Sequence, residues 1–369
     1  MAHVERTAPI AAPMGADLSL AALILLGTRF VQGFIFWGGA TRRLIYDIHD
    51  VAGVEHAVKL DFDLPGFVAA KLTHALPGAL WVQAPIEWTL RQPDLIVASV
   101  WLWTFAELAV GLGLMLGIAT RASALVSIWL NVVLMVIFGW MGSTCLDEWT
   151  MAVSGVAMSS AVFLAGAGSY SLDNRYVTGS DFAHTRAWMP WIFSGPLPDA
   201  TLRKLALRLG FASALFTVIT YQILFGAVVS PLHSRVNFHR HDIAVSAPVV
   251  APDGSVKFDA YVDAGPDTGA AYIVAAKLLD GSGELLAEWS GEALAALPEA
   301  AIHNVYPYVW ASQFKTERIG FSGQTGARAK ITLPAPTTVK PTESSTRVLL
   351  LEAIDGTIWR GVAGNQPAP

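Results

Sequence analysis

Five long apolar stretches constrain the fold of this 369-residue chain more than any other feature of its sequence. Each comes close to, or exceeds, the roughly 20 residues that a helix needs to cross the hydrocarbon layer of a membrane. Charged residues make up only 14% of the chain, against about 25% in ordinary soluble domains. The sequence therefore predicts an integral membrane protein whose helices cover residues 18–40, 95–120, 122–140, 151–168 and 209–230.

The first apolar stretch is expected to be a retained helix. It is too long for the apolar core of a signal peptide, and the residues before it are barely basic. The loop at 141–148 carries two acidic residues and no lysine or arginine, whereas residues 169–208 carry five basic residues. Basic loops stay on the cytoplasmic side. We therefore expect the N-terminus on the inner, cytoplasmic side of the membrane and the C-terminal domain on the outer side.

The first loop, residues 41–94, departs from this charge pattern because it holds five basic residues, but it is long and also carries six acids before Asp94. Its apolar pieces between residues 64 and 84 predict short helices on the outer membrane face.

The pattern changes after Pro231, where short apolar or alternating segments are separated by turn-type sequences. About seven short strands are expected there, which favours a β-sandwich with immunoglobulin-like topology. The predicted architecture is thus a membrane α-helical bundle of four helices plus a fifth, followed by an all-β domain. The expected parts are a four-helix domain at 1–195, the fifth helix at 196–232 and the β-sandwich at 233–369.

Cys145 is the single cysteine, so an internal disulfide, a cysteine-rich iron–sulfur site and a CxxCH haem attachment are all excluded. It precedes the fourth predicted helix, whose N-terminal N–H groups would favour the reactive thiolate. Asp147 and Glu148 act in the opposite direction. The alternative is an inert, buried cysteine.

Arg29 and Glu107 are the two charged residues inside predicted spans. A charge at that depth is costly unless it is paired or lies beside a polar cavity, so both are functional candidates. They could form a structural ion pair at one depth. The functional hypothesis is a polar group at a quinone head or on a proton path.

Basic residues gather at the predicted outer surface. Arg42 and Arg43 follow the first helix and, with His49, could hold an oxyanion, because guanidinium groups match such oxygens bidentately. The alternative is an anchor for lipid headgroups. After the fifth helix, His239 and His241 would share one face of a strand, with Arg240 between them. An anion-binding cluster is favoured there over a metal site, and a solvated linker is nearly as well supported.

Other function classes are disfavoured by what the sequence lacks. It has no dinucleotide-binding, P-loop, HExxH or GxSxG pattern in the required context, and no basic tail that indicates nucleic acid. Its many tryptophans, Trp149 among them, are expected mostly at membrane interfaces, and a few could flank a quinone ring.

These features resemble a known family. The run GTRFVQGF at 27–34, the long first loop and the run GSTCLDEW at 142–149 resemble the DoxD subunit of thiosulfate:quinone oxidoreductase. The fifth helix, which ends in VSPLH at 229–233, and the β domain after it resemble the DoxA subunit. The two are fused in one chain. The resemblance implies a protein of the bacterial inner (cytoplasmic) membrane, with its N-terminus in the cytoplasm and its C-terminal domain in the periplasm.

The resemblance implies that the chain oxidises thiosulfate to tetrathionate and passes two electrons to a membrane quinone. Quinone is then a co-substrate, and no haem, flavin or metal is expected. Cys145 is the expected covalent catalyst. The expected thiosulfate ligands are Arg42, Arg43, His49, His239, Arg240 and His241. The residues expected to serve the quinone and its protons are Arg29, Glu107 and Trp149.

Two other hypotheses remain. One is a non-enzymatic, DoxX-like membrane scaffold or binding protein. The other is a transporter for sulfur oxyanions, for which five helices without an inverted repeat match poorly. A homo-oligomer is compatible with each of these hypotheses.

Overall fold

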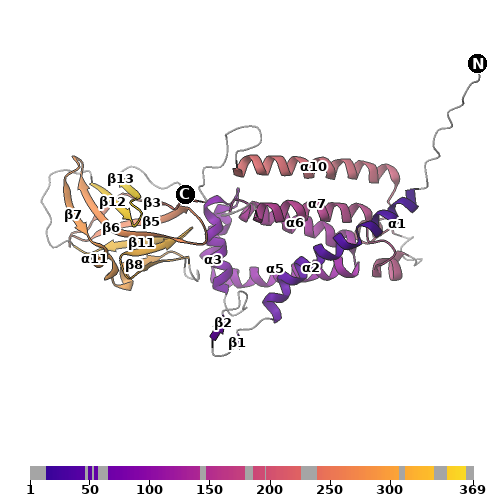
Figure 1. Ribbon diagram of the computed structural model, residues 1–369, viewed down its shortest axis with the longest axis horizontal. Coiled ribbons are helices and arrows are strands. Elements are labelled where there is room, and N and C mark those ends of the chain that lie inside the picture. Colours follow the sequence, from indigo (N-terminus) through magenta and orange to yellow (C-terminus); the bar gives the residue numbers. More distant parts are fainter. Residues whose placement is uncertain are drawn as a thin grey trace, which may run out of the picture. The chain divides into compact units, whose positions relative to one another are not determined.

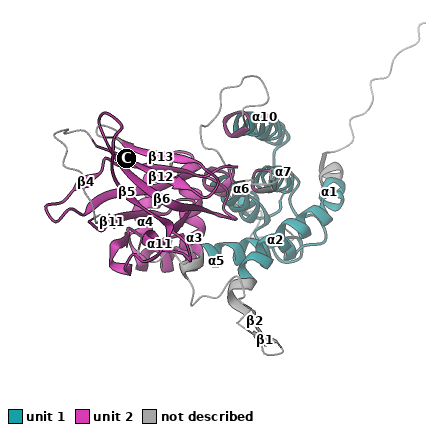
Figure 2. Ribbon diagram, turned by 60° about the vertical axis from the view of Figure 1, so that its left-hand side comes forward, with its two compact units in different colours: residues 1–58, 101–133, 150–221 teal, residues 59–100, 134–149, 222–369 magenta. Residues whose placement is uncertain are grey.

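Figure 1 shows the computed structural model coloured along the sequence. It divides into two compact units, which Figure 2 shows in different colours. Unit 1 comprises residues 1–58, 101–133 and 150–221, and unit 2 comprises residues 59–100, 134–149 and 222–369. The structure describes residues 14–45, 49–51, 54–56, 65–141, 147–178, 186–195, 197–225, 239–306, 312–335 and 347–362. Within these ranges, side chains are described except at 14–18, 42–67, 147, 178 and 362.

Long helices dominate the first 225 residues. Among the described residues, α5, α6, α7 and α10 are long and apolar enough to cross a membrane, which confirms the second to fifth predicted spans. The helices of this part are α1 (Met14–Ile24), α2 (Leu26–Ile45), α5 (Pro93–Leu116), α6 (Thr120–Phe138), α7 (Asp147–Ala165), the π-helix η2 (Asn174–Thr178), α9 (Met189–Ile192) and α10 (Asp199–Phe225).

The first predicted span, residues 18–40, differs from a single straight helix. The chain turns at Leu25, between α1 and α2. Helix α2 is amphipathic: Phe30 and Phe34 are exposed on one side, whereas Gln32 is buried on the other. A helix with a buried polar face must direct that face to its neighbours and not to lipid. The turn at Leu25 thus divides the predicted span into two helices, the short apolar α1 and the amphipathic α2.

Helices α2 and α5 approach each other closely through glycines. A Cβ atom on Gly33 would lie 2.8 Å from the Gly111 carbonyl oxygen, and one on Gly111 would lie 2.6 Å from the Trp37 backbone nitrogen. Small residues allow such contact between membrane helices. This contact fixes how residues of α5 align with those of α2.

The long first loop contains the short helices that its apolar pieces predict. The backbone there forms a hairpin and then three helical segments, which are β1 (His49–Val51), β2 (Val54–His56), α3 (Pro65–Ala75), η1 (Leu76–Gly78) and α4 (Gln83–Leu90). The three segments belong to unit 2. The Trp140 indole donates a hydrogen bond to the Ala75 carbonyl at 2.9 Å, and its ring leaves no room for a side chain at Gly78.

In its described residues the C-terminal part is all-β apart from two short helical turns, which confirms the predicted sandwich class. Its two sheets are antiparallel, with strand orders β13-β12-β6-β10-β9 and β3-β5-β11-β8; β7 pairs with β6, and β4 with β5. The elements are β3 (Asp242–Val245), β4 (Val249–Val250), β5 (Val256–Ala264), β6 (Ala270–Asp280), β7 (Leu285–Trp289), α11 (Gly291–Ala295), η3 (Glu299–Ala301), β8 (Ile302–Asn304), β9 (Phe314–Thr316), β10 (Phe321–Gln324), β11 (Arg328–Leu333), β12 (Arg347–Ala353) and β13 (Ile358–Val362).

Alternation along the strands builds the core between the sheets. Phe258 and Ala260 on β5 are buried, while Asp259 between them is exposed. Ile273 on β6 and Leu349 on β12 come from the opposite sheet and join the same apolar cluster. The period of two thus places one face of each sheet against the other.

Candidate functional site

Four of the predicted site residues cannot be placed by their side chains. Cys145 lies outside the described residues, between α6 and α7. Arg42 and Arg43 belong to the last turn of α2, and His49 begins β1, but their side chains are likewise outside the described set. Their roles in thiosulfate binding and in the covalent step stay predictions.

Glu107 lies inside the helical bundle, on α5. Its side chain is 7% exposed, and it accepts a hydrogen bond from the indole nitrogen of Trp103, with Nε1 2.7 Å from Oε1. Its other oxygen would lie 3.2 Å from a Cβ on Gly39, so α2 covers it closely. A carboxyl group held at this depth is a candidate for proton transfer.

Arg29 is buried near the start of α2, and it binds backbone groups. Its guanidinium donates to the carbonyl oxygens of Ala167 at 3.1 Å and Tyr170 at 2.7 Å, in the segment that follows α7. A Cβ on Gly117, just past the end of α5, would lie 2.5 Å from the same guanidinium. These contacts tie three segments of the bundle together.

Arg29 and Glu107 do not form the pair that sequence analysis considered. Arg29 meets Gly117, whereas Glu107 meets Gly39, ten positions further along α2. At 1.5 Å per residue, this separates the two levels by about 15 Å of helix axis. The antiparallel alignment of α2 and α5 thus places the two charges at different depths.

A second arginine and an aspartate stabilise the same end of the bundle as Arg29. The Asp173 carboxylate accepts hydrogen bonds from the backbone N–H groups of Ala119 and Thr120 at the start of α6, at 2.8 and 3.0 Å. Arg121, 1% exposed, donates to the carbonyl oxygens of Phe163, Pro190, Phe193 and Gly195. Sequence analysis did not single out Asp173. Both residues satisfy helix ends, which is a structural role.

A chain of buried polar side chains crosses the middle of unit 1. Gln32 on α2 donates to the Ser127 hydroxyl at 3.1 Å, and that hydroxyl lies 2.7 Å from the Ser159 hydroxyl on α7. Asn131 donates to the Ser127 carbonyl at 2.8 Å, and Gly155 on α7 leaves room for its amide. Interhelical bonds of this kind hold membrane helices together.

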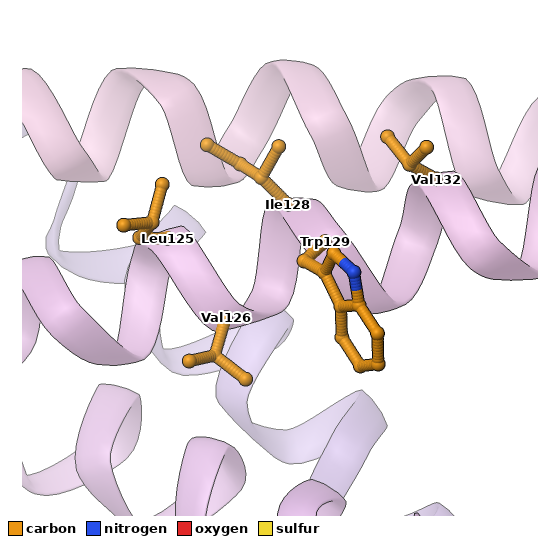
Figure 3. A pocket seen from close by; sticks show the side chains of 5 residues that line it. All are labelled: Leu125, Val126, Ile128, Trp129 and Val132. Atoms are coloured by element: carbon orange, nitrogen blue, oxygen red, sulfur yellow. The ribbon is translucent and has the colours of Figure 1, made fainter.

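An apolar groove follows one face of α6 (Figure 3). It has a volume of about 470 Å³ and is lined by Leu125, Val126, Ile128, Trp129 and Val132. These positions repeat with the helical period, and Trp129 is 58% exposed. Its ring centroid lies 6.5 Å from that of Trp103, the residue that holds Glu107.

Trp149 packs at the start of α7 in unit 2. Its ring meets Phe225, the last residue of α10, edge to face, with 6.5 Å between the ring centroids. Such a contact anchors one helix end on another. The role of Trp149 beside a quinone stays a prediction.

The histidine pair of the sequence analysis precedes β3 and is not part of a strand. His239 and Arg240 are exposed, whereas the His241 ring is tucked against the β5–β6 loop, where a Cβ on Gly265 would lie 2.3 Å from it. The expectation that both histidines share a strand face is therefore wrong, because Gly265 leaves a space that draws in only His241. Arg240 lies near Asp355. Hydrogen bonds from Thr357 are the main cause of the lowered pKa of Asp355, and the positive charge of Arg240 also contributes.

His74 on α3 is a titratable residue that sequence analysis missed. It is 6% exposed, and its Nε2 lies 2.9 Å from the Gln324 side-chain oxygen on β10. Beside it, Lys71 forms an ion pair with Asp267 at 3.1 Å. Burial lowers the pKa of His74 and, likewise, that of His241. Among the described residues, His74 Nδ1 and His241 Nε2 are buried without hydrogen-bond partners.

A second missed cluster joins α4 to the β domain within unit 2. One Glu87 carboxylate oxygen accepts from Arg91 at 2.6 Å and from Arg328 at 2.8 Å. Arg328 also lies over the Tyr261 ring, 4.4 Å from its centroid. Burial raises the pKa of Tyr306, in the same cluster, to about 12, so its phenol stays neutral. Residues 87 and 328 are too far apart in sequence for any local pattern to connect them.

Within the described part of the chain, no group of three or more histidine, cysteine, aspartate or glutamate side chains could hold a metal ion. The titratable side chains that the structure brings together are instead held by arginine, tryptophan and glutamine partners. Hydrogen bonds and ion pairs with such partners are suited to proton transfer or to stabilising the fold.

One solved structure, "Structure of Iho670 Flagellar-like Filament", is similar over 44% of this chain and 96% of that chain, at 11% identity. The TM-score is 0.19. A likeness at this level carries no argument about fold or function.

Two family models match the chain in succession. The model for TQO small subunit DoxD matches residues 25–197, and the model for TQO small subunit DoxA matches residues 225–361. The first match runs from Leu25, after α1, through α9 to Leu197, and the second runs from Phe225, the last residue of α10, through the β domain to Gly361. The chain therefore belongs to the DoxD and DoxA families, and it carries both small subunits of thiosulfate:quinone oxidoreductase (TQO) in a single polypeptide.

Proposed function

We propose that this protein oxidises two thiosulfate ions to tetrathionate and passes the two electrons to a membrane quinone. The observation that carries the proposal is the match to both TQO small subunits within one chain. The helical bundle supports it, because four of its helices are fit to cross a membrane and one of them holds the buried carboxyl group of Glu107.

The proposed chemistry uses one cysteine. Cys145 thiolate and one thiosulfate lose two electrons together and form a cysteine S-thiosulfonate, while the quinone takes two electrons and two protons and becomes a quinol. A second thiosulfate then attacks the cysteine-bound sulfur. This attack forms the central S–S bond of tetrathionate and releases the Cys145 thiolate. A second cysteine is unnecessary, because the second thiosulfate acts as the resolving thiol.

The proposed thiosulfate site uses cations at the outer surface that the charge bias of the loops predicts. In an inner-membrane protein, this surface faces the periplasm. Arg42, Arg43 and Arg240 would bind the sulfonate oxygens, since guanidinium groups pair with such oxygens in a fork. The exposure of Arg240 and His239 is compatible with that role. His49 and His239 would complete the site by hydrogen bonding, whereas the His241 ring is buried against the β5–β6 loop.

Glu107 and Arg29, which were both expected to serve the quinone, have different contacts and are assigned different roles. Glu107 is assigned to proton transfer, because it is buried in the bundle and held by one indole donor. Arg29 is assigned to helix packing, because two carbonyl oxygens occupy its guanidinium. Trp149 stays the predicted aromatic neighbour of the quinone.

The test is thiosulfate-dependent reduction of decylubiquinone by the purified full-length protein in nanodiscs. The expected stoichiometry is two thiosulfates consumed for each quinone reduced and each tetrathionate formed. Cys145→Ala is expected to abolish turnover. Wild-type turnover in that variant would remove the covalent route, and no turnover in the wild-type protein would overturn the enzymatic proposal in favour of a membrane scaffold.

A further inference from the structure

The groove on α6 contains one polar group in an otherwise apolar lining. Leu125, Ile128 and Val132 supply aliphatic surface, and Trp129 supplies both a ring and an indole N–H (Figure 3). Among the described residues, that N–H has no hydrogen-bond partner. A lipid acyl chain has no acceptor for this N–H group, whereas the carbonyl oxygen of a quinone can accept its hydrogen bond.

The groove also leads to a buried acid. The Trp129 ring lies 6.5 Å from the Trp103 ring, at an interplanar angle of 41°. The Trp103 indole donates to Glu107 at 2.7 Å, and Glu107 is 7% exposed. An exposed aromatic donor is thus connected, through a single side chain, to a titratable group inside the bundle.

We propose that this groove is the quinone site of the protein: the quinone ring lies against Trp129, one carbonyl oxygen accepts its indole N–H, and the isoprenoid tail follows the aliphatic face of α6. This inference rests on the proposed function, which supplies a quinone as electron acceptor. Offset stacking on tryptophan suits a flat ring. Aliphatic lining with a few placed donors is the usual make-up of a small-molecule site.

The proposal also gives Glu107 and Trp103 distinct roles. Reduction of the bound quinone needs two electrons, which are released when Cys145 and one thiosulfate form the S-thiosulfonate, and two protons, which come from water. Glu107 relays one of these protons to the quinone. Trp103 is a positioning residue, because it holds the Glu107 carboxyl group by its indole N–H.

Photolabelling with an azido-substituted decylubiquinone, followed by peptide mapping, tests the site without any need for turnover. The wild-type protein in nanodiscs is expected to be labelled on the peptide that spans α6, and excess decylubiquinone is expected to remove the label. Label elsewhere, or label on α6 that decylubiquinone does not displace, would overturn the proposal in favour of a lipid-filled face or a second copy of the chain.

Two matched variants sharpen the test. Trp129→Phe keeps the ring and removes the N–H donor, so KM for decylubiquinone should rise about tenfold, the effect of one lost hydrogen bond, with KM for thiosulfate unchanged. Trp101→Phe removes another exposed tryptophan, which stacks on Phe105 away from the groove lining, and should leave both constants unchanged. Equal KM values for decylubiquinone in both variants would contradict the proposal that the quinone binds in this groove.

The two proposals fail in different ways. A protein that labels on α6 but never oxidises thiosulfate would retain the quinone site and lose the proposed function. A protein with normal turnover and label outside α6 would retain the function and lose the site.

Discussion

Trp103 and Glu107 lie one helical turn apart on α5, and the indole nitrogen of the first donates to a carboxylate oxygen of the second at 2.7 Å. Residues four apart on a helix face the same direction, so their contact is intrinsic to α5. Gly39 on α2 leaves the space that the other carboxyl oxygen needs, since an added Cβ there would lie 3.2 Å from it. The acid is thus held in one position within the bundle.

Replacing Glu107 with glutamine tests its role as a proton donor. Glu107→Gln keeps the size of the side chain and an oxygen that Trp103 can bind, but the amide cannot deliver a proton. We expect kcat for quinone reduction to fall about 100-fold, with KM for thiosulfate unchanged. Steady-state kinetics at saturating decylubiquinone measure the effect.

The control for this variant is Asp94→Asn, which removes an exposed acid from the first turn of the same helix. Its kcat should stay within about twofold of wild type, as is usual for surface changes. If Glu107→Gln turned over as fast as this control, proton delivery would have to use another group.

Gly111 and Gly38 give a matched pair for helix packing. A Cβ on Gly111 would lie 2.6 Å from the Trp37 backbone, whereas one on Gly38 would meet nothing within 4 Å. Alanine favours a helix over glycine by about 1 kcal/mol. Gly38→Ala should therefore keep or slightly raise the melting temperature in detergent.

Gly111→Ala should instead lower the melting temperature, because α2 must move away from α5, and overpacking costs about 1–3 kcal/mol. Thermal unfolding followed by circular dichroism compares the two variants. The close α2–α5 contact would be refuted by a Gly111→Ala protein as stable as Gly38→Ala.

The Glu87–Arg328 contact is expected to stabilise unit 2 more than a surface ion pair does. Both side chains are largely covered, at 21% and 24% exposure, and Glu87 also binds Arg91. Arg328→Met should cost about 2 kcal/mol of unfolding free energy, since it leaves Glu87 with fewer partners and removes the cation over Tyr261. Denaturant unfolding of the full-length protein measures the loss.

Lys277→Met is the matched control for that experiment. Lys277 pairs with Glu352 at 3.0 Å on the surface of the sandwich, with both side chains more than a third exposed. Exposed pairs contribute about 0–1 kcal/mol. A loss as large in Lys277→Met as in Arg328→Met would show that burial of the Glu87 cluster has no special effect.

The sequence allowed the architecture to be predicted because that architecture follows from simple periods. A membrane span requires about 20 apolar residues, and a half-buried strand such as β5 requires alternation. The turn at Leu25 was missed, since it depends on which face of α2 meets a neighbour. The depths of Arg29 and Glu107 were missed for the same reason: glycine contacts between α2 and α5 set the alignment, and composition does not reveal them.

The candidate site was only partly predictable. Glu107 stood out because a charge inside a span is rare. Trp103 could have been found four residues before it by its helical spacing. His74 and Gln324 are 250 positions apart, and Glu87 and Arg328 are 241 apart. Contacts over such separations depend on tertiary packing, which no pattern in one sequence specifies.

The buried His74 predicts that unit 2 loses stability as the pH falls. Burial lowers the pKa of His74 below its ordinary value of 6.5, so the unfolded chain binds a proton more readily than the folded one. His74 therefore destabilises the fold progressively as the pH falls from about 6.5 towards the lowered pKa. The hydrogen bond to Gln324 and the negative charge of Asp267 oppose this effect, whereas the positive charge of Lys71, and that of His241 once it is protonated, add to it.

His74→Gln keeps a donor for the Gln324 oxygen and cannot titrate, so the melting temperature of this variant should depend less on pH. We expect the difference between wild type and His74→Gln to favour the wild type more at pH 8 than at pH 5. His303→Gln, which replaces an exposed histidine on β8, should leave the pH dependence unchanged. The prediction would be contradicted if the melting temperatures of wild type and His74→Gln changed equally between pH 5 and pH 8. Burial would then impose no protonation cost at His74.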